Sequence, residues 1–220
     1  MFARPDLKQL RGKPERVLAA IDDYHGRFHQ LMNVGRPKGA FISDIIAERK
    51  PRVMIELGGY VGYSAILFGA ALRQTGNGAR YVSIEQNPEM AAVAAQLVEL
   101  AGLRDAVRII VGSSGEVLQE MVAAKDIDGV DCIFIDHWQK LYRPDLWLLE
   151  GLGALVPGRS LLVADNVIMP GAPEYLEWVQ ATPQEKKAIV ARSDVGSLAP
   201  NPGLVYETTV SEFDTDFGKV

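Results

Sequence analysis

The hydrophobic positions of the chain alternate between two patterns from residue 52 onward. Short apolar runs rich in β-branched residues are each followed by a longer stretch with apolar residues at three- and four-residue spacing, which predicts alternating strands and helices. The predicted strands are RVMIEL (52–57), RYVSIE (80–85), VRIIV (107–111), VDCIFID (130–136) and SLLVADN (160–166). Because these runs are apolar on both sides, we expect an α/β fold in which helices cover both faces of a parallel sheet.

The two ends of the chain follow other patterns. Residues 14–31 and about 40–50 are predicted as helices, joined by a loop rich in Gly and Pro at 32–39. After the last strand, a helix at 171–180 precedes two strand-like runs, AIVARSD and LVYETTVSEF, which we interpret as an antiparallel hairpin at the sheet edge. Without repeats or a linker, residues 1–220 are predicted to form a single domain.

Composition narrows the class of partner. The 220 residues carry a net charge of −5, which argues against nucleic acid or an anionic membrane as partner. No apolar run approaches the roughly 20 residues needed to span a bilayer, and the polar start lacks a signal core. The single cysteine, Cys132, lies in an apolar run and is expected to be buried. We therefore expect a cytoplasmic protein that acts on a small molecule, with its oligomeric state left open.

A glycine-rich loop follows the first predicted strand, as Gly58-Gly59-Tyr60-Val61-Gly62. Its spacing differs from the three-glycine pattern of dinucleotide-binding proteins. Glu56 just ahead of it favours a cationic ligand, such as the ammonium and sulfonium of S-adenosylmethionine, although a merely tight turn remains an alternative. Glu85, at the end of the second strand, can accept both hydroxyls of a ribose. Ser114 after the third strand suits either an adenine contact or a helix cap.

Oxygen-bearing side chains close the fourth and fifth predicted strands. Asp136 ends one strand, and Asp165 with Asn166 ends the other. Since neighbouring parallel strands end at one edge of the sheet, these side chains are expected to share a cleft and to suit Mg²⁺. Trp138 offers an aromatic face there, whereas His137 as a zinc ligand lacks the His and Cys partners that zinc needs.

Together these motifs resemble the catechol O-methyltransferase family over most of the chain. The segments that carry the resemblance are MNVG (32–35) followed by KG, IELGGYVGYSA (55–65), IEQNP (84–88), AG (101–102), VGSS (111–114), DHW (136–138) and ADNVIMPGAP (164–173). The resemblance implies a three-layer, Rossmann-like methyltransferase fold with a seven-stranded sheet whose last strand is antiparallel. It also implies that the N-terminal helices, about residues 1–50, cap the cofactor and substrate cleft.

By the same resemblance, residue roles carry over from the family. Those expected to bind the cofactor are Met32 and Val34 at its methionine portion, Glu56, Gly58, Tyr60 and Ser64 at its amino acid end, Glu85 at the ribose, and Gly112, Ser114, His137 and Trp138 around adenine. Asp136, Asp165 and Asn166 match the Mg²⁺ ligands. The substrate is expected to lie among Asn166, Trp138, Pro170 and Met32.

Two positions depart from the family pattern. Gln139 stands where the family has a lysine that takes the substrate proton, and an amide cannot act as a base at neutral pH. Lys140, one position later, is the candidate replacement. In the closing hairpin, Val205 falls where the family has a glutamate that holds the second hydroxyl, with Glu207 on the same strand face.

Four functions are therefore open, in decreasing order of support. The first is Mg²⁺-dependent methyl transfer from S-adenosylmethionine to an oxygen of a small diol or phenol. The second is a non-methylating Lewis-acid enzyme, such as a cyclase, lyase or isomerase, on the same scaffold, motivated by Gln139 and Val205. A silent binding protein is the third. A nicotinamide dehydrogenase comes last, because the three-glycine fingerprint is absent.

Overall fold

A five-stranded parallel sheet forms the centre of the computed structural model, which describes residues 4–28, 30–195, 198–215 and 218–219. The strands are β1 (Val53–Leu57), β2 (Arg80–Glu85), β3 (Val107–Val111), β4 (Cys132–Ile135) and β5 (Leu161–Ala164). Their order is β3-β2-β1-β4-β5. The chain thus builds one half of the sheet outward from β1, returns to its other side and adds β4 and β5. Ligands of such sheets bind where the order reverses, which here is beyond the carboxyl ends of β1 and β4.

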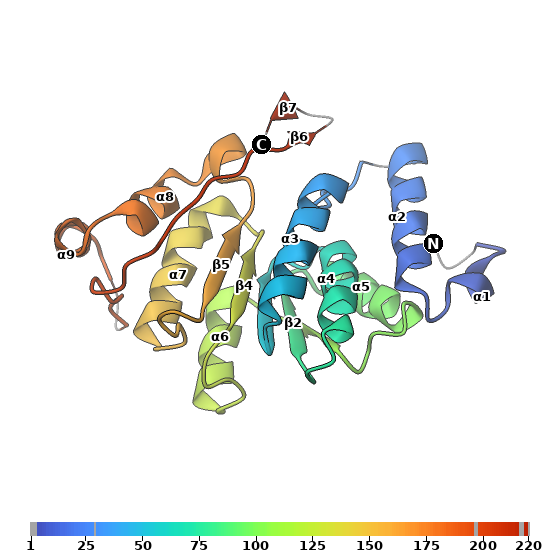
Figure 1. The fold of residues 1–220 in the computed structure, drawn as a ribbon, viewed down its shortest axis with the longest axis horizontal. Helices are drawn as coiled ribbons and strands as arrows, with labels where there is room; N and C mark the ends of the chain where they lie inside the picture. Colours follow the sequence, from blue (N-terminus) through green and yellow to red (C-terminus); the bar gives the residue numbers. More distant parts are fainter. Residues whose placement is uncertain (1–3, 29, 196–197, 216–217, 220) are drawn as a thin grey trace.

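Helices cover both faces of the sheet, as predicted (Figure 1). On one side lie α2 (Pro14–Arg27), α3 (Arg36–Arg49), α4 (Tyr63–Gln74) and α5 (Pro88–Leu100), with the short α1 (Leu7–Leu10) at their edge. On the other side lie α6 (Ser114–Ala123), α7 (Tyr142–Gly151), α8 (Pro173–Gln180) and α9 (Pro183–Ala191).

Each face has its own apolar core. Phe68 of α4 packs edge-on against Phe134 of β4 in one core, and Trp147 packs against Trp178 in the other. Burying both faces explains why the strand sequences are almost entirely apolar, so the α/β class and the three layers are confirmed. Among the described residues, no helix is both long and apolar enough to cross a membrane.

The C-terminal hairpin is where the sequence-based prediction was wrong. AIVARSD was predicted as a strand, but most of it belongs to helix α9. Thr182 caps this helix with Glu185 in a reciprocal capping box, and Pro183 occupies its first turn. These start signals outweigh the preference of Ile189 and Val190 for strands.

The second predicted strand of the hairpin is also absent. LVYETTVSEF (204–213) runs along the molecule without strand pairing. The only further strands in the described part of the chain are β6 (Asp214–Thr215) and β7 (Gly218–Lys219), which pair antiparallel with each other and not with the main sheet. The expected seven-stranded sheet is thus replaced by five parallel strands and a separate two-stranded ribbon.

Candidate active site

Two acids meet at the carboxyl edge of the sheet. Asp136 directly follows β4 and Asp165 directly follows β5, and these strands are paired in register. The main-chain N–H of Asp136 donates to Leu57 and that of Asp165 donates to Ile135, so the sheet ladder itself holds both residues. Asn166 comes next in the chain. The structure therefore places the three residues predicted as metal ligands at one edge of the sheet.

A lysine that the sequence analysis did not nominate binds this group. The Lys38 ammonium donates to Asp165 Oδ1 at 2.5 Å and to Asn166 Oδ1 at 2.8 Å. Lys38 lies in the first turn of α3 and is only 8% exposed. The sequence could have indicated that Lys38 is buried. Lys38, Ile42 and Ile46 recur every four residues and therefore lie on one face of the helix, which is the buried face.

Burial and neighbouring negative charges act on the carboxyl group of Asp136 at this edge of the sheet. Burial raises the pKa of Asp136 well above its ordinary value, and the negative charges of Asp165 and Glu56 raise it further. No group of three His, Cys, Asp or Glu residues converges anywhere in the described chain, so this set consists of two carboxyl groups and one amide. Oxygen donors that already hold an ammonium fit a hard divalent cation such as Mg²⁺.

The glycine loop packs closely against the main chain of Asp136. Gly58 has a φ of +96°, and a Cβ on it would lie 2.5 Å from the Asp136 carbonyl oxygen. A Cβ on Gly59 would lie 2.3 Å from Ser83 Oγ. Only glycine allows this approach, so the loop must lie directly beside the acid cluster.

Glu85 fixes the far side of the same loop. Its carboxylate accepts from the main-chain N–H of Tyr60 and from that of Asn87, both at 2.7 Å. Glu85 thus stands at the carboxyl end of β2 as expected; one carboxylate oxygen holds the glycine loop through Tyr60, and the other holds the turn before α5 through Asn87.

The Glu56 side chain lies in the protein interior beneath the glycine loop and is not exposed to solvent. The side chain is wholly buried, and the Ser83 hydroxyl donates to one carboxyl oxygen. Burial raises the pKa of Glu56 to about 7, although the hydroxyls of Ser64, Ser83 and Tyr81 oppose the rise. The predicted electrostatic pull of Glu56 on a cationic ligand would therefore act from the interior.

Beyond β3 and β4, a second polar cluster links α6, α7 and the loop after β4. Asp145 of α7 accepts from the Ser114 hydroxyl and lies 2.7 Å from His137 Nε2. The His137 ring stacks on Tyr142 at a centroid distance of 5.2 Å. His137 Nδ1 is buried and has no hydrogen-bond partner in the described chain, which fits a ligand that supplies one.

The family model for O-methyltransferases matches residues 18–193, most of this chain. The chain belongs to the O-methyltransferase family. Catechol O-methyltransferase of Bos taurus is 43% identical over 77% of this chain, and that of Sus scrofa is 44% identical over 69%. The chain spans 61% of the bovine relative, less than two thirds of its length, and 79% of the pig relative.

A solved structure has the same fold. The O-methyltransferase from Bacillus cereus in complex with SAH superposes with a TM-score of 0.61, covering 82% of this chain and 79% of that chain at 22% identity. The predicted Rossmann-like methyltransferase fold is therefore confirmed.

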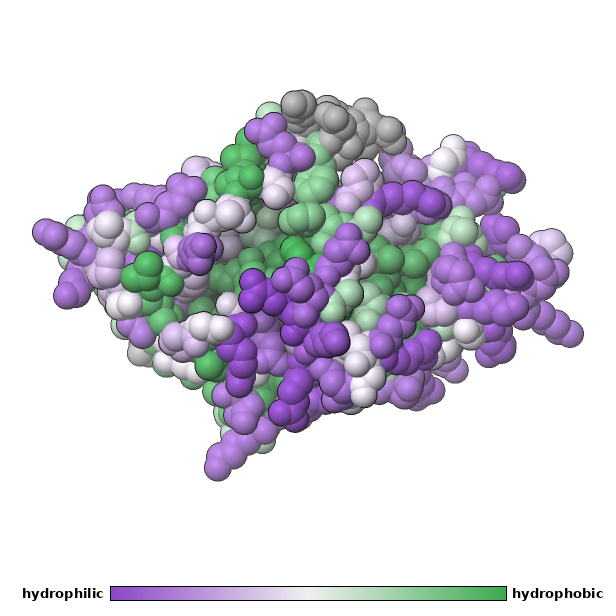
Figure 2. Space-filling view, viewed as in Figure 1, coloured by the Kyte–Doolittle hydropathy of each residue, from purple (hydrophilic) through white to green (hydrophobic). Residues whose placement is uncertain are grey.

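The rim of this candidate site is apolar. Met32 and Trp138 are 79% and 62% exposed, while Val34 is buried. Pro170 lies in the turn η2 (Val167–Gly171) directly after Asn166. Figure 2 shows apolar residues over the segment that leads into α8 and in the hollow between it and α3. The remaining nominated positions, Tyr60 and Gly112, lie in the loops after β1 and β3.

Three residues predicted from the sequence form no hydrogen bond or ion pair with the acid cluster in the described chain. Lys140 is exposed, and its ammonium lies 5.3 Å from the centre of the Trp138 ring, while Gln139 begins a short 3₁₀ turn (Gln139–Leu141). Val205 is 71% exposed, and its neighbour Tyr206 donates to Glu150 near the far end of α7. Because α7 starts at the carboxyl edge of the sheet and runs away from it, the structure does not bring Val205 to the acid cluster.

Proposed function

We propose that the protein transfers the methyl group of S-adenosylmethionine to a hydroxyl oxygen of a small catechol-like or phenolic molecule, in a Mg²⁺-dependent reaction. The observation that carries the proposal is the convergence of Asp136, Asp165 and Asn166 beside the glycine loop. The catechol O-methyltransferases at 43% and 44% identity support the same reaction.

The cofactor would lie over the ends of β1, β2 and β3. The Gly58–Gly62 loop would approach its amino acid end, as only glycine could, with Ser64 below and Met32 and Val34 alongside. Glu85 would accept ribose hydroxyls, and the unpartnered His137 Nδ1 would face the base. Asp145 already holds the opposite ring nitrogen, so the ring is oriented before a ligand binds.

The metal ion would be held by Asp136, Asp165 and Asn166. When bound, it would supply Lewis acidity that lowers the pKa of a substrate hydroxyl. The Asp136 backbone lies against the glycine loop and its carboxyl group interacts electrostatically with Asp165, so methyl donor and acceptor would meet on the two sides of Asp136. Trp138, Met32 and Pro170 would keep a planar substrate out of water.

The direct test is transfer of labelled methyl from S-adenosylmethionine to a panel of catechols and monophenols, with Mg²⁺ or with EDTA. We expect methylated catechol only with Mg²⁺. Asp165→Asn should lower the rate by about a hundredfold or more, because a Lewis-acidic ion contributes several kcal/mol. The matched control is Asp105→Asn, at an exposed carboxylate paired with Arg73. Absence of transfer to every acceptor would refute the proposal, and transfer that persists in EDTA would refute its metal dependence.

A non-methylating Lewis-acid enzyme is the second candidate. Gln139 stands where the family lysine is expected, and the Lys140 ammonium lies over Trp138. Under this hypothesis the wild type shows no methyl transfer, and the Gln139→Lys variant acquires methyl-transfer activity. Methylation by the wild type at a rate that Gln139→Lys leaves unchanged would exclude this candidate.

A further inference from the structure

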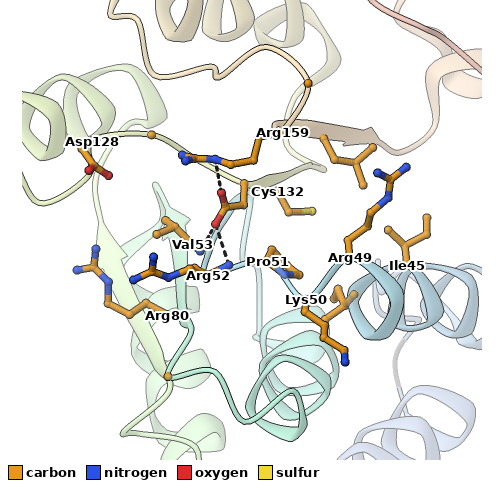
Figure 3. Close-up of a pocket in the computed structure, with 16 residues that line it drawn as sticks. Ile45, Arg49, Lys50, Pro51, Arg52, Val53, Arg80, Asp128, Cys132 and Arg159 are labelled. Carbon is orange, nitrogen blue, oxygen red and sulfur yellow. Dashed lines mark hydrogen bonds and ion pairs between the residues drawn. The ribbon is translucent and has the colours of Figure 1, made fainter.

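A hollow of about 620 Å³ lies at the amino ends of the strands, at the opposite edge of the sheet from the acid cluster (Figure 3). The last turns of α3, the starts of β1 and β2, and the loops before β4 and β5 surround it. Its volume falls within the range of small-molecule sites in proteins. The O-methyltransferase activity proposed above uses none of these residues.

The hollow has a charge opposite to that of the protein. Five cations line it, namely Arg49, Lys50, Arg52, Arg80 and Arg159, against two carboxylates, Asp128 and Asp131. The lining therefore has an excess of three positive charges in a chain whose net charge is −5. Concave walls concentrate such a field on a ligand inside them.

The framework of the hollow is fixed by hydrogen bonds. Asp131 is neutralised by Arg159, at 2.6 Å, and accepts from the main-chain N–H groups of Arg52 and Val53. Arg80 donates to the main-chain oxygen of Asp126 and also pairs with the Asp126 carboxylate at 3.6 Å. These contacts hold the backbone in place and leave other cations available.

Arg49 and Arg52 are available to a ligand. Their guanidinium groups have no hydrogen bond or ion pair within the described part of the chain. Figure 3 shows them on opposite sides of the hollow, whereas Lys50 points away from its centre. Two unpaired arginines lining one hollow provide planar, multidentate donors suited to phosphate oxygens.

The residues at the bottom of the hollow include no reactive nucleophile. Cys132 lies there, but burial raises the pKa of its thiol to about 12, so it remains a neutral thiol. The neighbouring floor residues Ile46 and Leu161 are apolar. The hollow is therefore suited to binding and not to nucleophilic attack.

We propose that this hollow binds a compact small molecule carrying two or more phosphate groups. The positive lining and the free guanidinium groups select for polyanions, and the limited volume of the hollow selects for small ones. A long polyanion, such as nucleic acid or an acidic protein segment, would extend beyond the hollow into the negative field of the remaining surface.

The test is calorimetric titration of the full chain with inorganic tripolyphosphate, in EDTA so that Mg²⁺ does not intervene. We expect saturable binding to one site that weakens as salt is raised. Arg49→Gln/Arg52→Gln should weaken it by about tenfold or more, since each lost charge-assisted contact is of that order. Neither side chain has a partner to lose, so the variant should fold, and its melting temperature checks this.

The matched control removes the same charge elsewhere. Arg27→Gln/Arg192→Gln replaces two exposed arginines at the ends of α2 and α9 and should leave the affinity within about twofold. Equal weakening in both double variants would show that net charge alone attracts the anion, which would overturn the proposal. Absence of binding to the wild type, or equally tight binding of a hexaglutamate peptide, would overturn it as well.

Discussion

Lys38 reduces the repulsion between Asp136 and Asp165. Its ammonium binds Asp165 and Asn166, and its positive charge lowers the pKa that burial and Asp165 raise at Asp136. A buried cation among buried acids offsets the cost of bringing them together, because an unpaired buried charge is expensive. The same geometry places Lys38 where a metal ion would be held, so its presence must influence how tightly the ion binds.

Replacing this lysine with an apolar residue of similar length separates the two effects. We expect Lys38→Met to lower the free energy of unfolding without metal by about 3 kcal/mol, because one partner of a buried ion pair is lost. Mn²⁺ should stabilise the variant more than the wild type, since no ammonium competes for the oxygens. Urea unfolding with and without Mn²⁺ measures both, and the exposed Lys8→Met is the control. Unchanged stability and unchanged Mn²⁺ affinity would contradict the role.

Glu56 is the second residue whose ionisation the fold controls. Its pKa is about 7 in the folded protein against an ordinary 4.5, with burial as the main cause. Between these two pH values the unfolded chain releases the proton while the folded chain keeps it. The folded state binds more protons there, so stability falls as pH rises from about 4.5 to about 7.

Glu56→Gln removes this dependence. Between about pH 5 and pH 8 the wild type should lose roughly 3 kcal/mol more stability than the variant, as expected for a shift of this size. Denaturant unfolding across this range measures the difference, and Glu120→Gln on the exposed face of α6 should behave as wild type. Identical pH profiles for wild type and Glu56→Gln would mean that Glu56 is ionised in the folded protein at pH 5.

At the scale of elements, a buried polar network anchors the C-terminal segment to α7, α8 and α9. Glu150 of α7 accepts from Trp178 Nε1, from the Tyr206 hydroxyl and from the main-chain N–H of Asn201. Lys186 of α9 donates to the Leu204 carbonyl at 2.6 Å, and its ammonium faces the rings of Trp178 and Tyr206. Side-chain hydrogen bonds thus hold a segment that has no strand partner.

Glu150→Ala is expected to detach this segment. It leaves three donors unpaired, two of them on Trp178 and Tyr206, and should lower the free energy of unfolding by about 3 kcal/mol or more. Limited proteolysis should then cut within 201–213 before the rest of the chain. Glu120→Ala, at an exposed glutamate, should change neither property. A proteolytic pattern identical to that of the wild type would show that the network does not anchor the segment.

At the scale of the whole molecule, the two edges of the sheet differ in charge. Acids and a glycine loop gather at the carboxyl ends of the strands, and unpaired arginines gather at the amino ends. α3 runs between these edges, with Lys38 in its first turn and Arg49 in its last. A parallel sheet makes this segregation simple, since each strand start lies at one edge and each strand end at the other.

The sequence by itself determined the five parallel strands, the helices between them and the placing of Asp136, Asp165 and the glycine loop at one edge. These features depend on local patterns, because apolar runs specify buried strands and residues that end neighbouring parallel strands must share an edge. The three proposed metal ligands could therefore be named without coordinates.

Only the tertiary structure decided the rest. Nothing local to Lys38 says that its ammonium meets Asp165, 127 positions away, and nothing local to Glu56 says that it turns inward to Ser83. The segment around Val205 has strand-forming residues but, in the described chain, no strand beside it, so long-range hydrogen bonds through Tyr206 set its course. Strand formation needs a partner, and a buried charge needs a counter-charge; both are supplied by residues distant in the sequence, which only the folded chain brings into contact.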